Sequence, residues 1–284
     1  MKILILGSSG ILGYSLYKEL RKTHKVYHTG LKKRLYDLTI KKNLLKILQK
    51  KIDVVINCCA ITNIEYAEKN KKITNNLNYQ LVKNIVLINK YKKFYFINFS
   101  TDHVYNSKNL LKNKEENVTF KSNYYTKSKI KADKLNSKFK FLTLRINFFG
   151  KSYRGKGTFT DWLILKLKNK EKIFLFEDQY FSALTLDTLI KIIKKLLKRK
   201  CFGIYNLGSK GSISKKNFAL KFYKNLKTKI NINFKSVKVN KFLTIKRSKY
   251  MFMNCRKFEK KFNIKLPNIN QEIKKASNQY NLNI

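Results

Sequence analysis

A tyrosine and a lysine in this chain are spaced so that they can act together in proton transfer. Tyr125 and Lys129 stand at positions i and i+4 of a segment that predicts a helix over residues 124–137, so their side chains share one face. A lysine ammonium beside a phenol favours the phenolate and lowers a tyrosine pKa from its ordinary value of about 10 toward neutral pH. The pair is therefore a candidate acid–base centre for a carbonyl or an alcohol.

A hydroxyl at a strand end is placed to bind the same substrate oxygen. Residues 99–103 read Phe-Ser-Thr-Asp-His and close the apolar run 94–99, which predicts a buried strand. Doubly wound folds bind ligands at the carboxyl ends of their strands, so Thr101 could hydrogen-bond the oxygen that Tyr125 protonates. The alternative is a strand that simply ends in small polar residues.

A glycine-rich turn follows the first predicted strand. Residues 7–13 read Gly-Ser-Ser-Gly-Ile-Leu-Gly and lie between the apolar run 2–6 and a helical pattern over 11–22. The glycines permit a tight turn and a close approach of the backbone to a pyrophosphate, and the helix N-terminus supplies N–H donors. The position of this turn between a strand and a helix predicts a dinucleotide-binding site.

The end of the second predicted strand, residues 25–28, indicates which nicotinamide cofactor binds. NAD-binding proteins place an acidic residue there to hold the ribose 2′-hydroxyl. Here residues 29–34 read Thr-Gly-Leu-Lys-Lys-Arg, and the first carboxylate is Asp37. Cations suit a 2′-phosphate, so we predict NADPH, with NADH as the alternative.

Strand and helix patterns alternate through the first half of the chain. Strands are predicted at 2–6, 25–28, 53–59, 94–99 and 141–146. Helices are predicted between them, at 11–22, 42–50, 75–91 and 124–137. This alternation predicts an α/β fold with a doubly wound parallel sheet of the Rossmann type, with residues 1–150 forming an NADP-binding domain.

The sequence after Gly150 predicts a smaller mixed α/β lobe. Helices are expected at 160–167, 186–198 and 214–226, strands at 172–176 and 203–207, and two further helices near the C-terminus. The only proline, Pro267, lies between those last two helices, where its ring ends the first. We expect residues 151–284 mainly to bind substrate and to contribute elements back to the sheet.

The charge of the chain could suggest a nucleic-acid partner. There are 64 Lys and Arg against 16 Asp and Glu, a formal net charge of +48, but 57 of the basic residues are Lys and 7 are Arg. Base recognition favours the arginine fork, and these lysines are spread along the whole chain. We expect no specific nucleic-acid partner, and a field that attracts anionic small molecules. A charge-driven nucleic-acid binder is the alternative.

Other classes of protein are disfavoured by what the sequence lacks. No apolar run approaches the ~18 residues of a membrane-spanning helix, and the run at 2–6 is not followed by a signal-peptide cleavage pattern. The cysteines have no metal-type spacing, and two are neighbours inside an apolar run: Cys58, Cys59, Cys201 and Cys255. We expect a cytoplasmic protein with no membrane partner, no disulfide framework and no bound metal.

Together these motifs resemble the extended short-chain dehydrogenase/reductases. The glycine turn, residues 57–62 after the third strand, the Ser-Thr-Asp strand end and the Tyr-x-x-x-Lys helix follow that pattern. Within the group the chain is most similar to the dTDP-4-dehydrorhamnose reductase family of sugar-nucleotide reductases, over most of its length. Segments 176–179, 204–209 and 247–267 also follow this family.

The resemblance implies a role for each motif. Thr101, Tyr125 and Lys129 would form the catalytic triad, Lys129 would also bind the nicotinamide ribose, and Asp102 would contact substrate beside Thr101 and Tyr125. The cofactor contacts would come from Gly7, Ser9, Gly10, Ile11, Leu12, Asp37, Leu38, Cys59, Ala60 and Thr62.

The implied reaction is the NADPH-dependent reduction of the C4 ketone of a nucleotide-activated deoxysugar, in dTDP-rhamnose or other cell-surface polysaccharide or O-antigen biosynthesis. Its partner would be a nucleotide-diphosphate sugar, and the oligomeric state is left open, with a homodimer among the alternatives. Sister dehydratases follow the threonine with Asp-Glu, whereas His103 follows Asp102 here, which disfavours dehydration. We expect His103 to pack under the substrate, and a catalytic acid is the alternative role.

Two other functions occur on the same fold. A nucleotide-sugar epimerase shares Thr101, Tyr125 and Lys129 but keeps its NAD bound through the cycle. A non-catalytic, cofactor-binding regulatory homologue shares the fold alone. The intact Tyr125 and Lys129 pair speaks against the second, because a silent homologue has no need of both.

Overall fold

A computed structural model describes residues 1–30, 37–153, 155, 157–226 and 232–280. The chain divides into two compact units. Unit 1 comprises Met1–Thr101, Lys121–Arg145 and Ile190–Tyr205, and unit 2 comprises Asp102–Phe120, Ile146–Leu189 and Asn206–Ile284. Each unit is therefore assembled from three separate segments of sequence.

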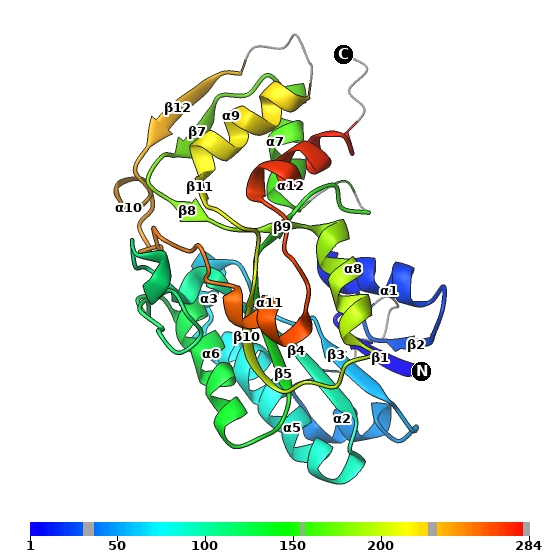
Figure 1. Cartoon of the computed structure of the whole chain (residues 1–284). Helices are drawn as coiled ribbons and strands as arrows, with labels where there is room; N and C mark the ends of the chain where they lie inside the picture. Colours follow the sequence, from blue (N-terminus) through cyan, green and yellow to red (C-terminus); the bar gives the residue numbers. More distant parts are fainter. Residues whose placement is uncertain (31–36, 154, 156, 227–231, 281–284) are drawn as a thin grey trace. The chain divides into compact units, whose positions relative to one another are not determined.

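A six-stranded sheet organises unit 1, with strand order β10-β5-β4-β3-β1-β2 (Figure 1). Its strands are β1 (Lys2–Leu6), β2 (Lys25–His28), β3 (Val54–Asn57), β4 (Tyr95–Thr101), β5 (Leu142–Ile146) and β10 (Gly203–Leu207). β1 pairs in parallel with β2 and β3, and β3 pairs in parallel with β4. The strand order reverses at β1, so the loops after β1 and β3 lie next to each other at the carboxyl edge of the sheet, where doubly wound folds bind their ligands. The predicted doubly wound α/β fold is confirmed.

The helices of unit 1 depart from the sequence prediction between β3 and β4. They are α1 (Ile11–Leu20), α2 (Lys41–Ile47), α3 (Ile64–Lys69), α4 (Lys71–Asn75), α5 (Leu81–Lys92) and α6 (Tyr124–Asp133). The single helix predicted over 75–91 was wrong in extent, because a π-helical turn, Asn76–Gln80, joins α4 to α5. Sequence analysis missed α3, which is too short to show periodicity, although Asn63 caps it by accepting a hydrogen bond from the Tyr66 N–H.

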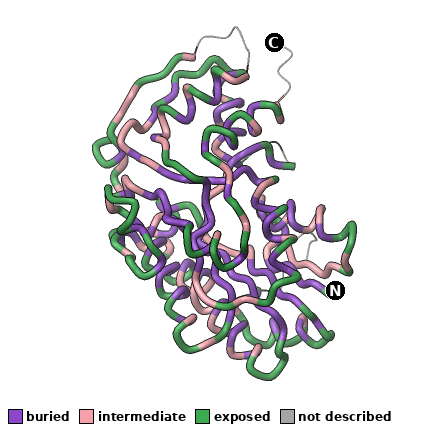
Figure 2. Tube along the Cα trace, viewed as in Figure 1, coloured by how far each residue is buried: buried purple, intermediate pink, exposed green. Residues whose placement is uncertain are grey.

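The core of unit 1 forms because the middle strands are apolar on both faces. Every residue of β3 and β4 is buried, as expected for parallel strands that are covered on both sides (Figure 2). From α5, Leu81, Ile85 and Ile88 pack into the same cluster as Val55 and Phe96 of the sheet. Their spacing of three and four residues places them on one helix face, which holds α5 against the strands.

Unit 2 combines helices with short two-stranded ladders. Its strands are β6 (Phe148–Phe149), β7 (Ile173–Phe176), β8 (Tyr180–Phe181), β9 (Leu184–Thr185), β11 (Ile213–Ser214) and β12 (Phe234–Val237). Its helices are α7 (Phe159–Lys168), α9 (Lys215–Asn225), α10 (Val239–Phe242), α11 (Arg256–Phe262) and α12 (Ile269–Ser277), while α8 (Leu186–Leu196) continues from unit 2 into unit 1. Phe218 and Phe222 of α9 pack with Phe149, Phe181 and Ile273 in its core.

Neither unit holds a helix of the kind that crosses a lipid bilayer, as far as the described residues extend. Pro267 lies between α11 and α12 as predicted. α11 ends at Asn263 in the left-handed conformation, and Asn268 and Gln271 form a capping box that starts α12.

The contact between α1 and β1 generates a test of the fold. A Cβ atom on Gly13 would lie 2.3 Å from the Gly7 carbonyl oxygen, whereas one on Gly10 would meet the same atom at 3.5 Å, an ordinary contact. We expect Gly13→Ala to lower the free energy of unfolding by about 2 kcal/mol, because backbone must move. Gly10→Ala should lower it by less than about 1 kcal/mol, the usual cost at a helix N-cap. Equal losses in urea unfolding would contradict the close packing.

Candidate active site

The glycine turn packs against the loop that follows β3. Gly7 has a φ of 80°, and a Cβ atom there would lie 2.7 Å from the Cys59 Sγ and 2.9 Å from the Cys59 backbone nitrogen. Only glycine fits, so the two predicted cofactor-binding segments meet at the point where the strand order reverses. Gly10 is the N-cap of α1, and neither a capping side chain nor an acidic residue satisfies the first turn of that helix. Its N–H groups are therefore suited to an anion.

The end of β2 is fixed to this turn. The Gly7 N–H donates to the Thr29 hydroxyl oxygen at 3.1 Å, and the Ser8 hydroxyl donates to the Thr29 carbonyl at 2.7 Å. Gly30 follows with a φ of 105°, where a Cβ atom would lie 3.0 Å from the Ser9 hydroxyl oxygen. The turn from β1 and the exit from β2 thus form one hydrogen-bonded unit.

Three parts of the predicted cofactor site near β2 remain to be located: the basic run, Asp37 and Leu38. The basic run Lys32-Lys33-Arg34, on which the preference for NADPH was based, lies outside the described residues. Asp37 is exposed and accepts hydrogen bonds from the Thr39 N–H and hydroxyl at 2.9 and 2.6 Å. Leu38 is buried in the core cluster of unit 1. Of these two residues, only Asp37 has an exposed side chain.

The loop after β3 is held by two asparagines. Asn57 ends β3, donates its side-chain amide to the Asn98 Oδ1 at 2.9 Å and accepts from the Cys59 N–H at 3.1 Å. Asn57 and Asn98 are register partners of the parallel strands β3 and β4. Cys59 and Ala60 are half-buried, and Thr62 is exposed.

Asn78, which sequence analysis missed, ties this loop to the helix that carries Tyr125. Asn78 lies in the π-helical turn, accepts from the Ile61 N–H at 2.8 Å and donates its amide to the Ile61 carbonyl at 3.0 Å and to the Ser128 hydroxyl at 2.9 Å. Ser128 in turn donates to the Tyr125 carbonyl at 2.7 Å. One signal for Asn78 was available in the sequence. It is a polar residue, next to Leu77 and three residues before Leu81, at a position of the helical pattern where an apolar residue is expected. Single π-helical turns often occur at functional sites.

The helix α6 begins at a well-defined N-terminus. Asn123 accepts from the Thr126 N–H at 3.0 Å, and the Glu68 carboxylate accepts from the Tyr124 N–H at 2.8 Å. A side-chain cap and a carboxylate at the positive end of the helix both stabilise this start. The position of Tyr125, the next residue, is fixed by these contacts, and it is 7% exposed.

Lys129 lies one turn after Tyr125 and joins α6 to β4. Its Nζ donates to the Phe99 carbonyl oxygen at 2.6 Å, although the side chain is only 4% exposed. Phe99 stands two residues before Thr101, the last residue of β4, so their side chains point to the same face of the sheet. Unit 1 thus brings the predicted pair of Tyr125 and Lys129 to the strand that ends in Thr101.

Burial changes the pKa of the Lys129 ammonium. Burial lowers the pKa of Lys129 to about 8, against the opposing attraction of Asp133 and then of Cys58 and Cys59. Asp133 is itself paired with the buried Arg145 at 2.9 Å. Burial raises the pKa of the Cys59 thiol to about 12, so this thiol is neutral. The ammonium is protonated at neutral pH, and a rise of pH through 8 removes its charge.

Unit 2 begins at Asp102, the residue that follows β4. Several polar and titratable side chains of unit 2 lie near Asp102 and His103. The Asn147 amide donates to Asp102 at 2.7 Å, and the His103 Nε2 lies 4.0 Å from its other oxygen. Burial, and after it the charges of Lys215 and Arg247, lowers the pKa of His103 to about 3. The imidazole is therefore neutral, and it cannot act as an imidazolium acid near pH 7.

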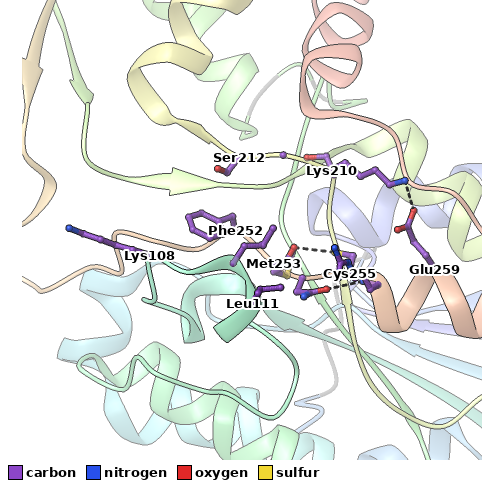
Figure 3. Close-up of a pocket in the computed structure, with 13 residues that line it drawn as sticks. Lys108, Leu111, Lys210, Ser212, Phe252, Met253, Cys255 and Glu259 are labelled. Atoms are coloured by element: carbon purple, nitrogen blue, oxygen red, sulfur yellow. Dashed lines mark hydrogen bonds and ion pairs between the residues drawn. The ribbon is translucent and has the colours of Figure 1, made fainter.

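A separate cavity of about 540 Å³ lies within unit 2 and contains none of the predicted catalytic or cofactor-binding residues (Figure 3). Leu111, Phe252 and Met253 contribute apolar surface to it. Lys210 and Glu259 form an ion pair at 3.2 Å along its lining.

Fold and site together define a dinucleotide-binding α/β protein with the Tyr-Lys arrangement of the extended short-chain dehydrogenase/reductases. The chain matches the family model described as the RmlD substrate binding domain over residues 1–282, and it belongs to that family.

Individual relatives agree with this assignment. The dTDP-4-dehydrorhamnose reductase of Salmonella typhimurium is 23% identical over 284 residues, which cover 94% of each chain. The crystal structure of the dTDP-4-dehydrorhamnose reductase of Bacillus anthracis in complex with NADP has a TM-score of 0.87 at 23% identity, covering 98% of this chain and 99% of that one. The corresponding protein of Clostridium acetobutylicum gives 0.87 at 22% identity, with the same coverage. At these identities the structural likeness establishes the fold.

The three side-chain hydrogen bonds of Asn78 provide a test of how the site is positioned. We expect Asn78→Leu to lower the free energy of unfolding by about 2 to 3 kcal/mol, because the Ile61 N–H and carbonyl lose their partner. Asn84→Leu is the matched control, since Asn84 is a buried asparagine of α5 that donates to the Thr39 carbonyl at 3.3 Å and accepts from the Gln80 side-chain amide at 3.0 Å. Urea unfolding measures both variants. A loss for Asn78→Leu no larger than that of the control would show that the bridge is unimportant.

Proposed function

We propose that this protein reduces the C4 ketone of a nucleotide-activated deoxysugar with NADPH, in the assembly of cell-surface polysaccharide. The observation that carries the proposal is the buried Lys129 ammonium, which shares a helix face with Tyr125 and donates to the backbone of the strand that ends in Thr101. Membership of the RmlD family and the names of its reductase relatives support a sugar-nucleotide substrate.

The glycine turn suits a dinucleotide because α1 begins there with uncapped N–H groups, which can bind a phosphate. At Gly7 a Cβ atom would collide with Cys59, so the turn packs directly against the loop after β3. The segments that would hold NADPH are residues 7–12, Asp37 and the loop from Cys59 to Thr62. The NADP complex of the Bacillus anthracis relative supports this choice. When bound, the reduced nicotinamide supplies a hydride.

Tyr125 is the residue that we assign to proton delivery. A ketone that accepts a hydride becomes an alkoxide, and the phenol hydroxyl can donate its proton to that oxygen. The resulting phenolate lies one helical turn from the Lys129 ammonium, whose positive charge stabilises it. Because both side chains are nearly buried, this attraction is screened less than it would be in water.

Thr101 and Lys129 orient the reacting groups. Thr101 is 3% exposed and ends β4, so its hydroxyl is held by the strand rather than by a loop. Its O–H can donate to the carbonyl oxygen and polarise it before the proton arrives. Lys129 also binds the nicotinamide ribose in this proposal, since its ammonium has two further N–H donors beyond the one that Phe99 accepts.

Replacing the phenol hydroxyl tests the assignment directly. We expect Tyr125→Phe to lower the turnover number by about 10³-fold, because proton delivery is lost, and to change the affinity for NADPH by less than about twofold. Tyr124→Phe is the control, since Tyr124 is the adjacent residue of α6 and has no assigned role. Stopped-flow or steady-state NADPH oxidation measures turnover, and quenching of NADPH fluorescence measures binding. Full turnover in Tyr125→Phe would exclude this role.

A panel of nucleotide-linked 4-keto sugars identifies the reaction. A reductase consumes NADPH in proportion to the 4-hydroxy sugar formed. An epimerase interconverts its sugars with no net oxidation of NADPH, and a regulatory protein converts none of them. Stoichiometric oxidation supports the proposal, and either of the other two results rejects it.

The pH dependence follows from the charge on Lys129. Its pKa of about 8 means that the ammonium is present below pH 8 and is lost as the pH rises through that value. We expect kcat/KM for NADPH, which reports the free enzyme, to be constant from pH 6.5 to 7.5 and to fall about tenfold per unit above pH 8. Measurement at saturating sugar in buffers of equal ionic strength checks this, and a profile that stays flat to pH 10 would contradict it.

A further inference from the structure

Three side chains of α6 follow one another at intervals of one helical turn, and all three are buried. Tyr125, Lys129 and Asp133 stand at positions i, i+4 and i+8, so they share one face of the helix. They are 7%, 4% and 3% exposed. A phenol, an ammonium and a carboxylate therefore lie in a row along the buried face of α6, and the whole row belongs to unit 1.

Asp133, the last residue of this row, is held by an arginine of β5. The Arg145 Nε donates to the Asp133 Oδ2 at 2.9 Å, and Arg145 is 2% exposed. This salt bridge compensates the charge of the buried carboxylate. The second carboxylate oxygen, Oδ1, is also buried, and no hydrogen-bond partner for it occurs among the described residues. Asp133 thus places a fixed negative charge on the helix face that carries Lys129.

The groups that act on Lys129 come from three elements. β4 supplies the Phe99 carbonyl, which accepts a hydrogen bond at 2.6 Å but carries no net charge. The loop after β3 supplies Cys58 and Cys59, and burial raises the pKa of both thiols, that of Cys59 to about 12, so they are neutral near pH 8. α6 supplies Asp133, which attracts Lys129 more strongly than either thiol does. The negative charge that favours the Lys129 ammonium is therefore chiefly that of Asp133.

We propose that Asp133 is a positioning residue for the reaction: held by Arg145, it keeps the Lys129 ammonium charged and so sets the upper pH limit of activity. This inference rests on the proposed function, which gives Lys129 its role beside Tyr125. The ammonium must remain protonated to stabilise the Tyr125 phenolate. Burial disfavours that charge, and a carboxylate one helical turn away in the same desolvated region opposes the effect of burial.

The variant Asp133→Asn removes the charge and keeps an oxygen that can accept a hydrogen bond from Arg145. We expect the fall in kcat/KM for NADPH, which begins near pH 8 in the wild type, to begin about one pH unit lower, because loss of an opposite charge lowers the pKa of an ammonium. Below pH 6, where Lys129 is charged in both proteins, kcat/KM should differ by less than about threefold. Steady-state oxidation of NADPH at saturating sugar measures both features.

Two variants serve as controls. Asp133→Glu retains the charge, so the fall in kcat/KM should stay near pH 8. Glu19→Gln removes a carboxylate of α1 that pairs with Lys22 at the surface at 2.8 Å, and it should leave the fall where it is. A salt bridge that is merely structural predicts another result, in which Asp133→Asn lowers kcat/KM equally at every pH and does not move the fall. That result would overturn the inference.

Urea unfolding tests the same charge without turnover. The pKa of Lys129 is about 8 in the folded protein against an ordinary value of 10.5, so between these values the unfolded chain binds more protons and the contribution of Lys129 to the free energy of unfolding rises with pH. The difference in this free energy between the wild type and Lys129→Met should start to rise near pH 8. In the Asp133→Asn background it should start to rise about one unit lower. Equal onsets would reject the inference.

A second variant covers the case in which Asp133→Asn fails to fold, since that change takes a carboxylate away from the buried Arg145. Asp133→Asn combined with Arg145→Gln replaces the ion pair by two neutral side chains, and it should move both onsets in the same direction. The two readouts also separate the two proposals. If no keto sugar is reduced but the unfolding onset depends on Asp133, the proposed function alone fails. If keto sugars are reduced and neither onset moves, the inference alone fails.

Discussion

Burial of the Lys129 ammonium is the constraint on which the arrangement of unit 1 depends. The charge is 4% exposed and has the Phe99 carbonyl as a hydrogen-bond acceptor at 2.6 Å. If α6 slid or rotated relative to β4, that acceptor would be lost and a desolvated cation would remain, at a cost of several kcal/mol. The contact therefore fixes the register between helix and strand, and with it the relation of Tyr125 to Thr101.

A second constraint, this one steric, acts after β1, two strands away from β4 in the same sheet. The backbone at Gly7 leaves no room for a Cβ atom beside Cys59, and the same residue's carbonyl excludes one at Gly13. Asn78 connects this region to the first, since its amide binds both the loop after β3 and Ser128 of α6. A site that must hold a dinucleotide beside an acid–base pair thus rests on two backbone contacts and one buried side chain, all positioned by the parallel order of β4, β3 and β1.

Much of the fold and of the candidate site could be predicted from the sequence, because the signals for them were periodic or local. Continuous apolar runs marked the central strands, and the glycine turn at 7–13 stood between a strand and a helix as the dinucleotide motif requires. The six-residue helix Ile64–Lys69 carries too few turns for a period, and the π-helical turn within 75–91 depends on tertiary contacts that no local rule describes. The bridging role of Asn78 could not be predicted for the same reason, since its partners are 17 and 50 residues away in the sequence.

The lysine content illustrates a more general limit of sequence reasoning. A chain with 57 lysines gives no way to choose among them by type or spacing, and a formal charge of +48 describes chiefly a solvated surface. Burial makes the distinction. Lys129 is 4% exposed and donates to the Phe99 carbonyl, whereas Lys127 and Lys131 of the same helix are exposed. The fold, and not the residue type or the charge, therefore sets the lysine beside Tyr125 apart from its neighbours.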